Sequence, residues 1–328
     1  MTAKKMNSLQ AVNSALAQAM AEDGKVLVLG EDVADREGGG VTGATAGLST
    51  RFGDDRVKST PISEQAIIGA AIGAALAGYK PVAEIMLMNF TTVAMDMIFN
   101  HAAKLRFMSG GQSTVPITIR TLTGAGWQTA GQHADHLEGW FAHTAGIKVV
   151  APSTPADYKG LLLSCIQDPD PCIFIESAGS LFIPGEVDEV ATPIPLGKAR
   201  IVQEGSDITI ISWSSQLLRC QAALPALAEA GISVELVDLR TVSPWDREAV
   251  LASVAKTGRA LVVHEAVRDF GPGGEIASTI AEELFGQLKA PVRRLGAPKS
   301  PVPFAKVLED AYIVSPERVA DAVKALMA

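Results

Sequence analysis

The sequence predicts an α/β protein of two domains, each with a mainly parallel sheet between two layers of helices. Its 328 residues exceed one ordinary domain and suit two units of about 150 residues each. Short apolar runs alternate with longer helical stretches along the chain, which is typical of β-α-β units with right-handed crossovers. Several runs are almost continuously apolar, as expected for strands covered on both faces.

Eight runs have the length and apolar content of buried strands. They lie at residues 26–30, 81–87, 116–121, 147–152 and 171–176, and then at 207–213, 233–239 and 260–265. Residues 181–200 separate the two groups and are rich in proline, glycine and acids without clear periodicity. We therefore predict a linker there, with one domain over residues 1–190 and a second over residues 191–328.

Three predicted helix starts share one pattern, a hydroxyl residue followed by proline. The hydroxyl can cap free N–H groups, and proline is tolerated in the first turn because its missing N–H is not needed there. These starts are Thr154-Pro155, Ser243-Pro244 and Ser315-Pro316. The most apolar stretch, residues 66–79, is shorter than the roughly 20 residues of a bilayer span. We predict a buried helix there and no membrane segment.

The overall composition argues against two classes of partner. The formal net charge is −8, and without a long basic run this disfavours nucleic-acid binding. The chain begins without the apolar core or cleavage pattern of a secretory signal. Its three cysteines, Cys165, Cys172 and Cys220, form no CxxC pair, which indicates reduced thiols. We expect a cytoplasmic protein that binds neither nucleic acid nor membrane.

Glycine-rich segments give weaker signals, each with two interpretations. The loop after the first strand, residues 38–47, has neither a GK[ST] ending nor GxGxxG spacing, so we favour a surface loop over a ligand loop. Residues 269–277 lead into a helix, where they either bind phosphate or form a structural turn. Gly69 and Gly73 share one face of a predicted helix. That face either packs within the domain or contacts another subunit.

Glu64 opens the very apolar predicted helix. A glutamate in the first turn commonly interacts only with the helix dipole, so its position alone does not indicate catalysis. His133 and His136 lie in a glycine-bounded loop, and imidazole suits proton transfer near neutral pH. His101 and His143 have apolar neighbours and are interpreted as packing residues.

An ordered set of motifs spans the chain. They are TPISE (60–64), GAAIG (69–73), MNF (88–90), AAKLRFMSGG (102–111), GQHADH (131–136), FAHTAGIKVVAPSTPADYKGLL (141–162) and PVPFAKVLEDAYI (301–313). In this order they resemble the beta subunit of the thiamine-diphosphate-dependent decarboxylase component of 2-oxo acid dehydrogenase complexes. That family includes the pyruvate, branched-chain and acetoin enzymes. The resemblance covers essentially the whole chain and implies two transketolase-type domains, a pyrimidine-binding and a C-terminal one.

The resemblance implies roles for four residues. Glu64 matches the glutamate that hydrogen-bonds the aminopyrimidine ring nitrogen and so helps form the ylid, after which the cofactor acts as electron sink. Phe90 matches an aromatic residue that packs on the pyrimidine ring, and Met86 matches a pocket-lining methionine. His133, preferred over His136, matches the active-site histidine that steers the substrate carboxylate or lipoyl group and takes part in proton transfer.

The family holds the cofactor diphosphate through Mg²⁺ with a GDG motif, and this sequence contains no GDG. The resemblance therefore implies an alpha subunit that supplies the diphosphate and Mg²⁺ site in an α₂β₂ heterotetramer, with a lipoyl acyltransferase core accepting the acyl group. Some members also bind a potassium ion through backbone positions. These positions match Ile117, Cys165, Ile166, Asp168 and Asp170.

Two departures from the family pattern bear on the substrate. Val93 stands where several relatives carry glutamine, and Ala134 and Asp135 follow His133 where Ser-Gln is common. We expect Asp135 to bring charge near the substrate pocket. The pattern is nearest the acetoin and pyruvate branches. Two other functions stay open: the C-terminal half of a split transketolase-type synthase, and a non-catalytic assembly subunit.

Overall fold

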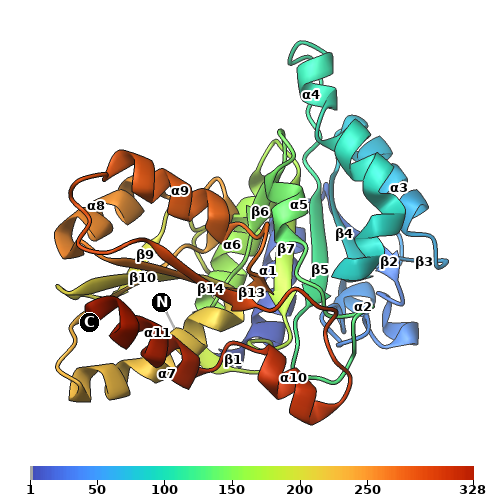
Figure 1. The fold of residues 1–328 in the computed structure, drawn as a ribbon. Helices are drawn as coiled ribbons and strands as arrows, with labels where there is room; N and C mark the ends of the chain where they lie inside the picture. Colours follow the sequence, from blue (N-terminus) through green and yellow to red (C-terminus); the bar gives the residue numbers. More distant parts are fainter. Residues whose placement is uncertain (1–2) are drawn as a thin grey trace.

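The computed structural model describes residues 3–328, which form two α/β domains built on two large sheets (Figure 1). The strands of the first sheet are β2 (Val26–Glu31), β3 (Val57–Thr60), β4 (Lys80–Leu87), β5 (Thr118–Thr123), β6 (Lys148–Val150), β7 (Cys172–Ser177) and β12 (Thr241–Ser243). Their order is β12-β6-β7-β5-β4-β2-β3. All neighbours run parallel except β12, which is antiparallel to β6.

Helices cover both faces of this sheet because alternate side chains of each strand point to opposite sides. The covering helices are α1 (Ser8–Glu22), α3 (Glu64–Leu76), the π-helical η3 (Met97–Ala102), α5 (Glu138–Ala142) and α6 (Pro155–Gln167). The pair α1 and α6 packs on the face that contains Val28 and Phe174. The other three pack on the face that contains Leu29 and Ile173.

The second sheet has the same three-layer arrangement. Its strands are β9 (Arg200–Gln203), β10 (Ile208–Ser212), β11 (Val234–Asp238), β13 (Ala260–Val267) and β14 (Arg293–Ala297), in the order β14-β13-β10-β11-β9. Only β9 is antiparallel to its neighbour. Its helices are α7 (Ser214–Glu229) and α11 (Pro316–Met327) on one face, and α8 (Arg247–Thr257) and α9 (Gly273–Glu283) on the other.

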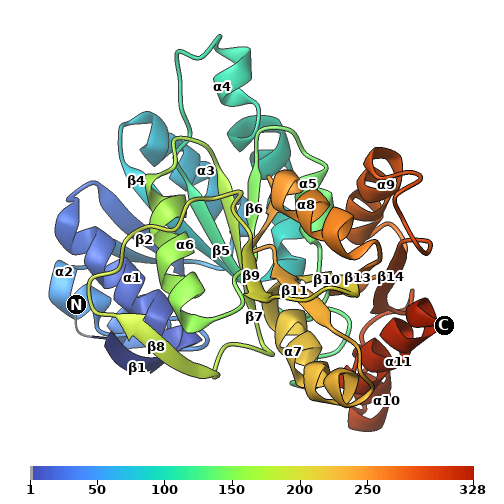
Figure 2. The same cartoon turned by 90° about the vertical axis from the view of Figure 1, so that its left-hand side faces the viewer.

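The remaining elements are short. They are η1 (Asp35–Glu37), α2 (Leu48–Phe52), η2 (Met88–Ala94), α4 (Leu105–Met108), α10 (Lys306–Tyr312) and an antiparallel pair of strands, β1 (Ala3–Asn7) and β8 (Pro184–Asp188). Figure 2 shows this pair beside α1 at the margin of the first domain. Over residues 3–328, no helix is long and apolar enough to cross a membrane.

The predicted fold class is confirmed, and each of the eight predicted strands is present. The prediction of an irregular linker is wrong at β8, because these residues pair with the N-terminal strand rather than run free. The sequence gives little sign of β12, which lies beyond residue 190 and yet joins the first sheet. A three-residue strand cannot show a period, so its place depends on its partner alone.

Two of the three predicted helix starts are confirmed. Thr154 and Ser315 each accept a hydrogen bond from a main-chain N–H in the first turn. The start at Ser243 is wrong: Ser243 ends β12, and Asp246 caps α8 instead. Its carboxylate accepts from the N–H of Ala249 at 3.2 Å, so the cap lies three residues later than the Ser-Pro pattern suggested.

Gly146, just before β6, offers a test of the packing between η3 and the sheet. Its φ is +96°, and a Cβ there would lie 2.0 Å from the carbonyl oxygen of Ala103. We expect Gly146→Ala to lower the free energy of unfolding by about 2–5 kcal/mol. Gly38→Ala is the control, since its backbone is left-handed with φ of +101° but the space around a Cβ is open; it should cost only about 1 kcal/mol. Urea unfolding followed by circular dichroism would measure both, and equal losses would contradict the packing argument.

Candidate cofactor site at one edge of the first sheet

Three predicted site residues follow strands that lie close together in the first sheet. Glu64 comes after β3, Phe90 after β4, and His133 after β5. The strands adjoin in the order β5-β4-β2-β3 and are parallel, so their carboxyl ends lie at one edge. This is the edge at which open parallel sheets bind ligands. The fold therefore gathers residues that are far apart in the sequence.

Glu64 is a buried acid at the start of a helix whose N-cap residue, Ser63, makes no side-chain capping hydrogen bond. It is the first residue of α3 and only 8 % exposed. Within residues 3–328 its side chain makes no hydrogen bond or ion pair. Its carboxylate oxygens are not among the buried side-chain atoms that lack a partner, so the carboxylate reaches the open edge of the sheet. A ligand bound there could donate a hydrogen bond to it.

Glu31, which sequence reasoning missed, lies beside Glu64. It ends β2, is 8 % exposed, and pairs in register with Thr60 of β3. Burial, followed by the negative charge of Glu64, raises the pKa of Glu31 above its usual value. An acid at the end of an apolar strand adjoining β3 was the signal that could have identified it.

A buried triad of charged side chains joins three neighbouring strands near this edge. Arg120 of β5 donates to Glu84 of β4 at 2.7 Å and to Glu176 of β7 at 2.7 Å. Since one guanidinium faces two carboxylates and Glu31 and Glu64 lie nearby, negative charge is in excess. Burial, outweighing Arg120, raises the pKa of Glu176. This excess suits a ligand that carries positive charge or N–H donors.

The glycine-rich loop after β2 covers this triad. A Cβ on Gly40 would lie 2.8 Å from the Glu84 carboxylate, so a side chain at that position would collide with it. The small cavity beside the triad is lined by Met86 of β4 together with Val41 and Thr42 of the loop. The favoured interpretation as a plain surface loop is therefore incomplete, because part of the loop packs over the charged triad.

Phe90 and His133 lie against each other. Their ring centroids are 5.5 Å apart with planes at 73°, an edge-to-face arrangement. Asn89 fixes the same pairing: its amide donates to the Asp135 carboxylate at 2.8 Å and accepts from the Asp135 N–H at 3.1 Å. The MNF segment and the histidine loop are thereby joined.

The structure explains the departures at Ala134 and Asp135 but not the one at Val93. The Asp135 carboxylate is held by Asn89, so its charge serves to attach the loop rather than to extend into open space. Ala134 is 1 % exposed and packs in a small apolar cluster. Val93 is 57 % exposed, so no contact within the described residues explains it.

His136 is a buried charged residue. It lies 3.4 Å from Glu138 and 3.3 Å from Glu265 of the second domain. Burial opposes its charge, but Glu265 and then Glu138 outweigh burial and raise its pKa to about 10. The same pair lowers the pKa of Glu265 to about 2 despite burial. This ion pair joins the two domains and leaves His133 as the histidine beside Phe90.

The five residues matched to a potassium site gather at the opposite end of β5 and β7. Lys148 lies 2.5 Å from Asp168 and 3.3 Å from Asp170. The carbonyls of Ile117 and Cys165 already accept main-chain N–H groups, at 3.0 and 3.3 Å. Each carbonyl keeps a second lone pair, and Ile166 lies beside them at the end of α6. No group of three or more His, Cys, Asp or Glu residues suited to a metal occurs over residues 3–328.

The segment 269–277 forms a structural turn. Gly271 and Gly273 pack on His264, where a Cβ at either position would lie 2.7 Å from the imidazole ring. His264 is fully buried and stacks on Trp213 at 5.4 Å. Burial lowers the pKa of His264 to about 4. The glycines therefore make room for the buried imidazole, which favours the interpretation as a structural turn.

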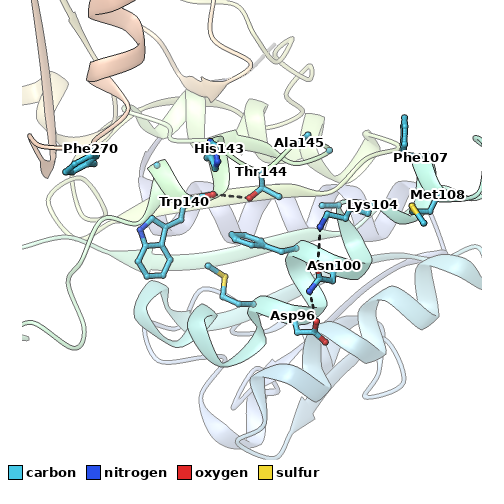
Figure 3. Close-up of a pocket in the computed structure, with 15 residues that line it drawn as sticks. Asp96, Asn100, Lys104, Phe107, Met108, Trp140, His143, Thr144, Ala145 and Phe270 are labelled. Carbon is cyan, nitrogen blue, oxygen red and sulfur yellow. Dashed lines mark hydrogen bonds between the residues drawn. The ribbon is translucent and has the colours of Figure 1, made fainter.

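A wide hollow lies away from the site. Its volume is about 1360 Å³, and Figure 3 shows Trp140, Phe107 and Phe270 around it, with Asp96, Asn100 and Lys104 hydrogen-bonded along one wall. Glu64, Phe90 and His133 are not among its lining residues. His143 lines this hollow. Both His143 and His101 are exposed. Their interpretation as packing residues is therefore wrong.

Comparison with known proteins places the chain in a family. Residues 4–182 match the pyrimidine-binding domain of transketolase, and residues 197–319 match the transketolase C-terminal domain. The chain is 44 % identical to the acetoin:2,6-dichlorophenolindophenol oxidoreductase subunit beta of Cupriavidus necator, over 99 % of this chain and 98 % of that one. It belongs to the family of acetoin and 2-oxo acid dehydrogenase beta subunits. The predicted resemblance is confirmed.

Other members of this beta-subunit family are similarly close. The pyruvate dehydrogenase E1 component subunit beta of Acholeplasma laidlawii is 42 % identical over 97 % of both chains. The 2-oxoisovalerate dehydrogenase subunit beta of Dictyostelium discoideum is 45 % identical over 94 % of this chain and 83 % of that one. A split-gene transketolase beta4 tetramer has the same fold, with a TM-score of 0.80 and 20 % identity over 98 % of both chains.

The His136 ion pair predicts a specific pH dependence of stability. Because the pKa of His136 is raised from 6.5 to about 10, its contribution is complete below pH 6.5 and is lost as the pH rises toward 10. His136→Gln would leave Glu138 and Glu265 buried without a cation, at a cost of about 3–5 kcal/mol. Melting temperatures between pH 6 and 10 should therefore fall for the wild type and change less for His136→Gln. Parallel curves would contradict a charged His136.

Proposed function

We propose that this chain is the beta subunit of an acetoin or pyruvate-type 2-oxo acid dehydrogenase. With an alpha subunit it would cleave the substrate on thiamine diphosphate and pass the acyl group to a lipoyl domain. The observation that carries the proposal is Glu64, a buried carboxylate without a protein partner at the carboxyl edge of the sheet. Phe90 and His133 lie together at the same edge.

Glu64 has the chemistry that the cofactor needs from this chain. Its carboxylate would accept a hydrogen bond from a protonated ring nitrogen of the aminopyrimidine. Burial would strengthen that bond, and the neighbouring Glu31 adds negative charge that favours the protonated ring. When bound, thiamine diphosphate supplies the ylid and the electron sink.

The other residues would bind and orient. The Phe90 ring offers a flat apolar face for the pyrimidine, and Met86 would line the pocket beside it. His133 lies edge-on to Phe90, from where its imidazole would steer a substrate carboxylate or lipoyl group and hold or release a proton. His133 is the proposed acid–base group, since His136 is committed to two buried carboxylates.

We propose that the alpha subunit covers an apolar face of α3 and supplies the diphosphate and Mg²⁺ site. Ala66, Ala70, Gly73 and Ala77 are exposed along one side of this helix. A Cβ on Gly73 would meet nothing within 4 Å, so the face is open to close approach by another chain. This supports the intersubunit interpretation of the Gly69–Gly73 face within an α₂β₂ heterotetramer.

Two further proposals concern a bound potassium ion and the compartment in which the chain acts. Potassium would bind the carbonyls near Ile117 and Cys165, with the Asp168 and Asp170 charges already balanced by Lys148 and Arg106. The chain would act in the cytosol, where its three buried cysteines stay reduced. The lipoyl acyltransferase core remains the proposed acceptor of the acyl group.

The split transketolase alternative has less support. Its solved counterpart is 20 % identical, against 42–45 % for the dehydrogenase beta subunits. The non-catalytic alternative leaves the unpartnered Glu64 and the Phe90–His133 pair without a reason.

Glu64→Gln tests the proposed role of the carboxylate. We expect the variant to assemble with its alpha subunit but to lose at least about 100-fold in activity, because the ring nitrogen loses its anionic partner. The measurement is reduction of 2,6-dichlorophenolindophenol with thiamine diphosphate, Mg²⁺ and a panel of acetoin, pyruvate and branched-chain 2-oxo acids. Glu248→Gln, an exposed acid on α8, is the control. Wild-type rates in Glu64→Gln would rule out the assignment.

A further inference from the structure

The loop that carries His133, residues 124–133, contacts Asn89 of the first domain and is also held by several groups of the second domain. Glu309 of α10 accepts hydrogen bonds from the N–H groups of Gly126 at 2.7 Å and Gln128 at 3.1 Å, both through the same carboxylate oxygen. Glu309 is fully buried, and its other oxygen has no hydrogen-bond partner within the described chain. Figure 1 shows α10 beside the loop that follows β5.

The backbone of this loop does not hold its shape by itself. Gly124 and Gly126 have φ of +113° and +123°, while Gln128 and Ala130, which are not glycines, have φ of +56° and +64°. Left-handed conformations at residues with a Cβ are unfavourable and persist only where the surroundings impose them. The N–H groups of Gly126 and Gln128, two residues apart, converge on one anion in this backbone, and Glu309 supplies that anion.

A second carboxylate supports the start of the loop. Glu265, at the carboxyl end of β13, accepts from the N–H of Ala125 at 3.0 Å. A Cβ on Gly124 would lie 3.2 Å from the same oxygen, so the backbone approaches this acid closely. The other Glu265 oxygen accepts from Ser215.

Apolar contacts complete the support from the second domain. Ala125 and Ala134 pack with Val302, Tyr312 and Ile313 in a small separate cluster. Gly131 lies two residues before His133, and a Cβ on Gly131 would lie 2.9 Å from Pro301. The segment from Ala297 to Ile313 therefore contacts the loop near its start, its middle and its end.

We propose that Glu309 and Glu265 are positioning residues: two carboxylates of the second domain that fix the loop backbone and so place the His133 imidazole against Phe90. Within the described residues, neither acid is hydrogen-bonded to Glu64, Phe90 or His133. The kinetic part of this inference depends on the proposed function of His133, whereas the structural part does not. On this view the second domain sets the geometry of a group that acts in the first.

Amide hydrogen exchange on the full chain tests the structural part. In Glu309→Gln the acceptor is no longer charged, and in Glu309→Ala it is absent, so exchange at Gly126 and Gln128 should accelerate about tenfold or more, most in Glu309→Ala. Asp310→Asn is the matched control, because Asp310 is exposed on the same helix and pairs with Lys306. Unchanged exchange in both Glu309 variants, with melting temperatures near the wild type, would overturn the proposal.

Kinetics of the complex reconstituted with its alpha subunit test the functional part. We expect kcat with the lipoyl domain to fall by about 10- to 100-fold in Glu309→Gln, because the histidine is misplaced, while the Kd for thiamine diphosphate stays unchanged. A merely structural role would instead weaken cofactor binding and assembly together. Wild-type kcat despite a loosened loop would overturn the functional part. A wild-type complex without dehydrogenase activity would refute the proposed function, and exchange would still decide whether Glu309 holds the loop.

Discussion

Parallel pairing of β3, β2, β4 and β5 is the constraint on which the candidate site depends. Because these strands run in one direction, every chain segment that leaves them does so at the same edge. Glu64, Phe90 and His133 need only follow their strands closely to meet there. A slip of one residue in any pairing would turn strand side chains to the opposite face, and the Arg120 triad, which joins β4, β5 and β7 through their side chains, opposes such a slip.

This edge of the sheet carries an excess of negative charge, which indicates what kind of ligand it could bind. Glu31, Glu64, Glu84 and Glu176 are all buried, with Arg120 as the cation that Glu84 and Glu176 share. A protein that only needed stability would be better served by apolar residues here. Buried acids without partners make sense where a ligand brings the missing donors. The unusual environment, more than any single residue type, therefore marks the edge as a binding site.

Sequence reasoning located the elements that carry their own period or cap, and missed those that depend on a partner. The long apolar strands and the Thr154 and Ser315 caps were predictable because their signals are local. The strands β8 and β12 were not, since each exists only through pairing with a distant segment. The site followed the same rule: Glu64 and His133 stand in motifs that imply their roles, whereas Glu31 and Glu265 acquire meaning only from residues that the fold brings beside them. Glu309 lies within the motif 301–313, but its bonds to the histidine loop appear only in the fold.

The histidine loop shows why such partners cannot be read from local sequence. Gly126 and its acceptor Glu309 are separated by 183 residues, and the Ala125 N–H reaches Glu265 across 140 residues. Gln128 and Ala130 are not glycines, so their left-handed backbone is unfavourable by itself, and contacts from the second domain help to hold it. The two domains are therefore separate in sequence and in their sheets, but both contribute to the candidate site. The first domain supplies the groups that would meet the cofactor, and the second supplies the anions that keep one of those groups in place.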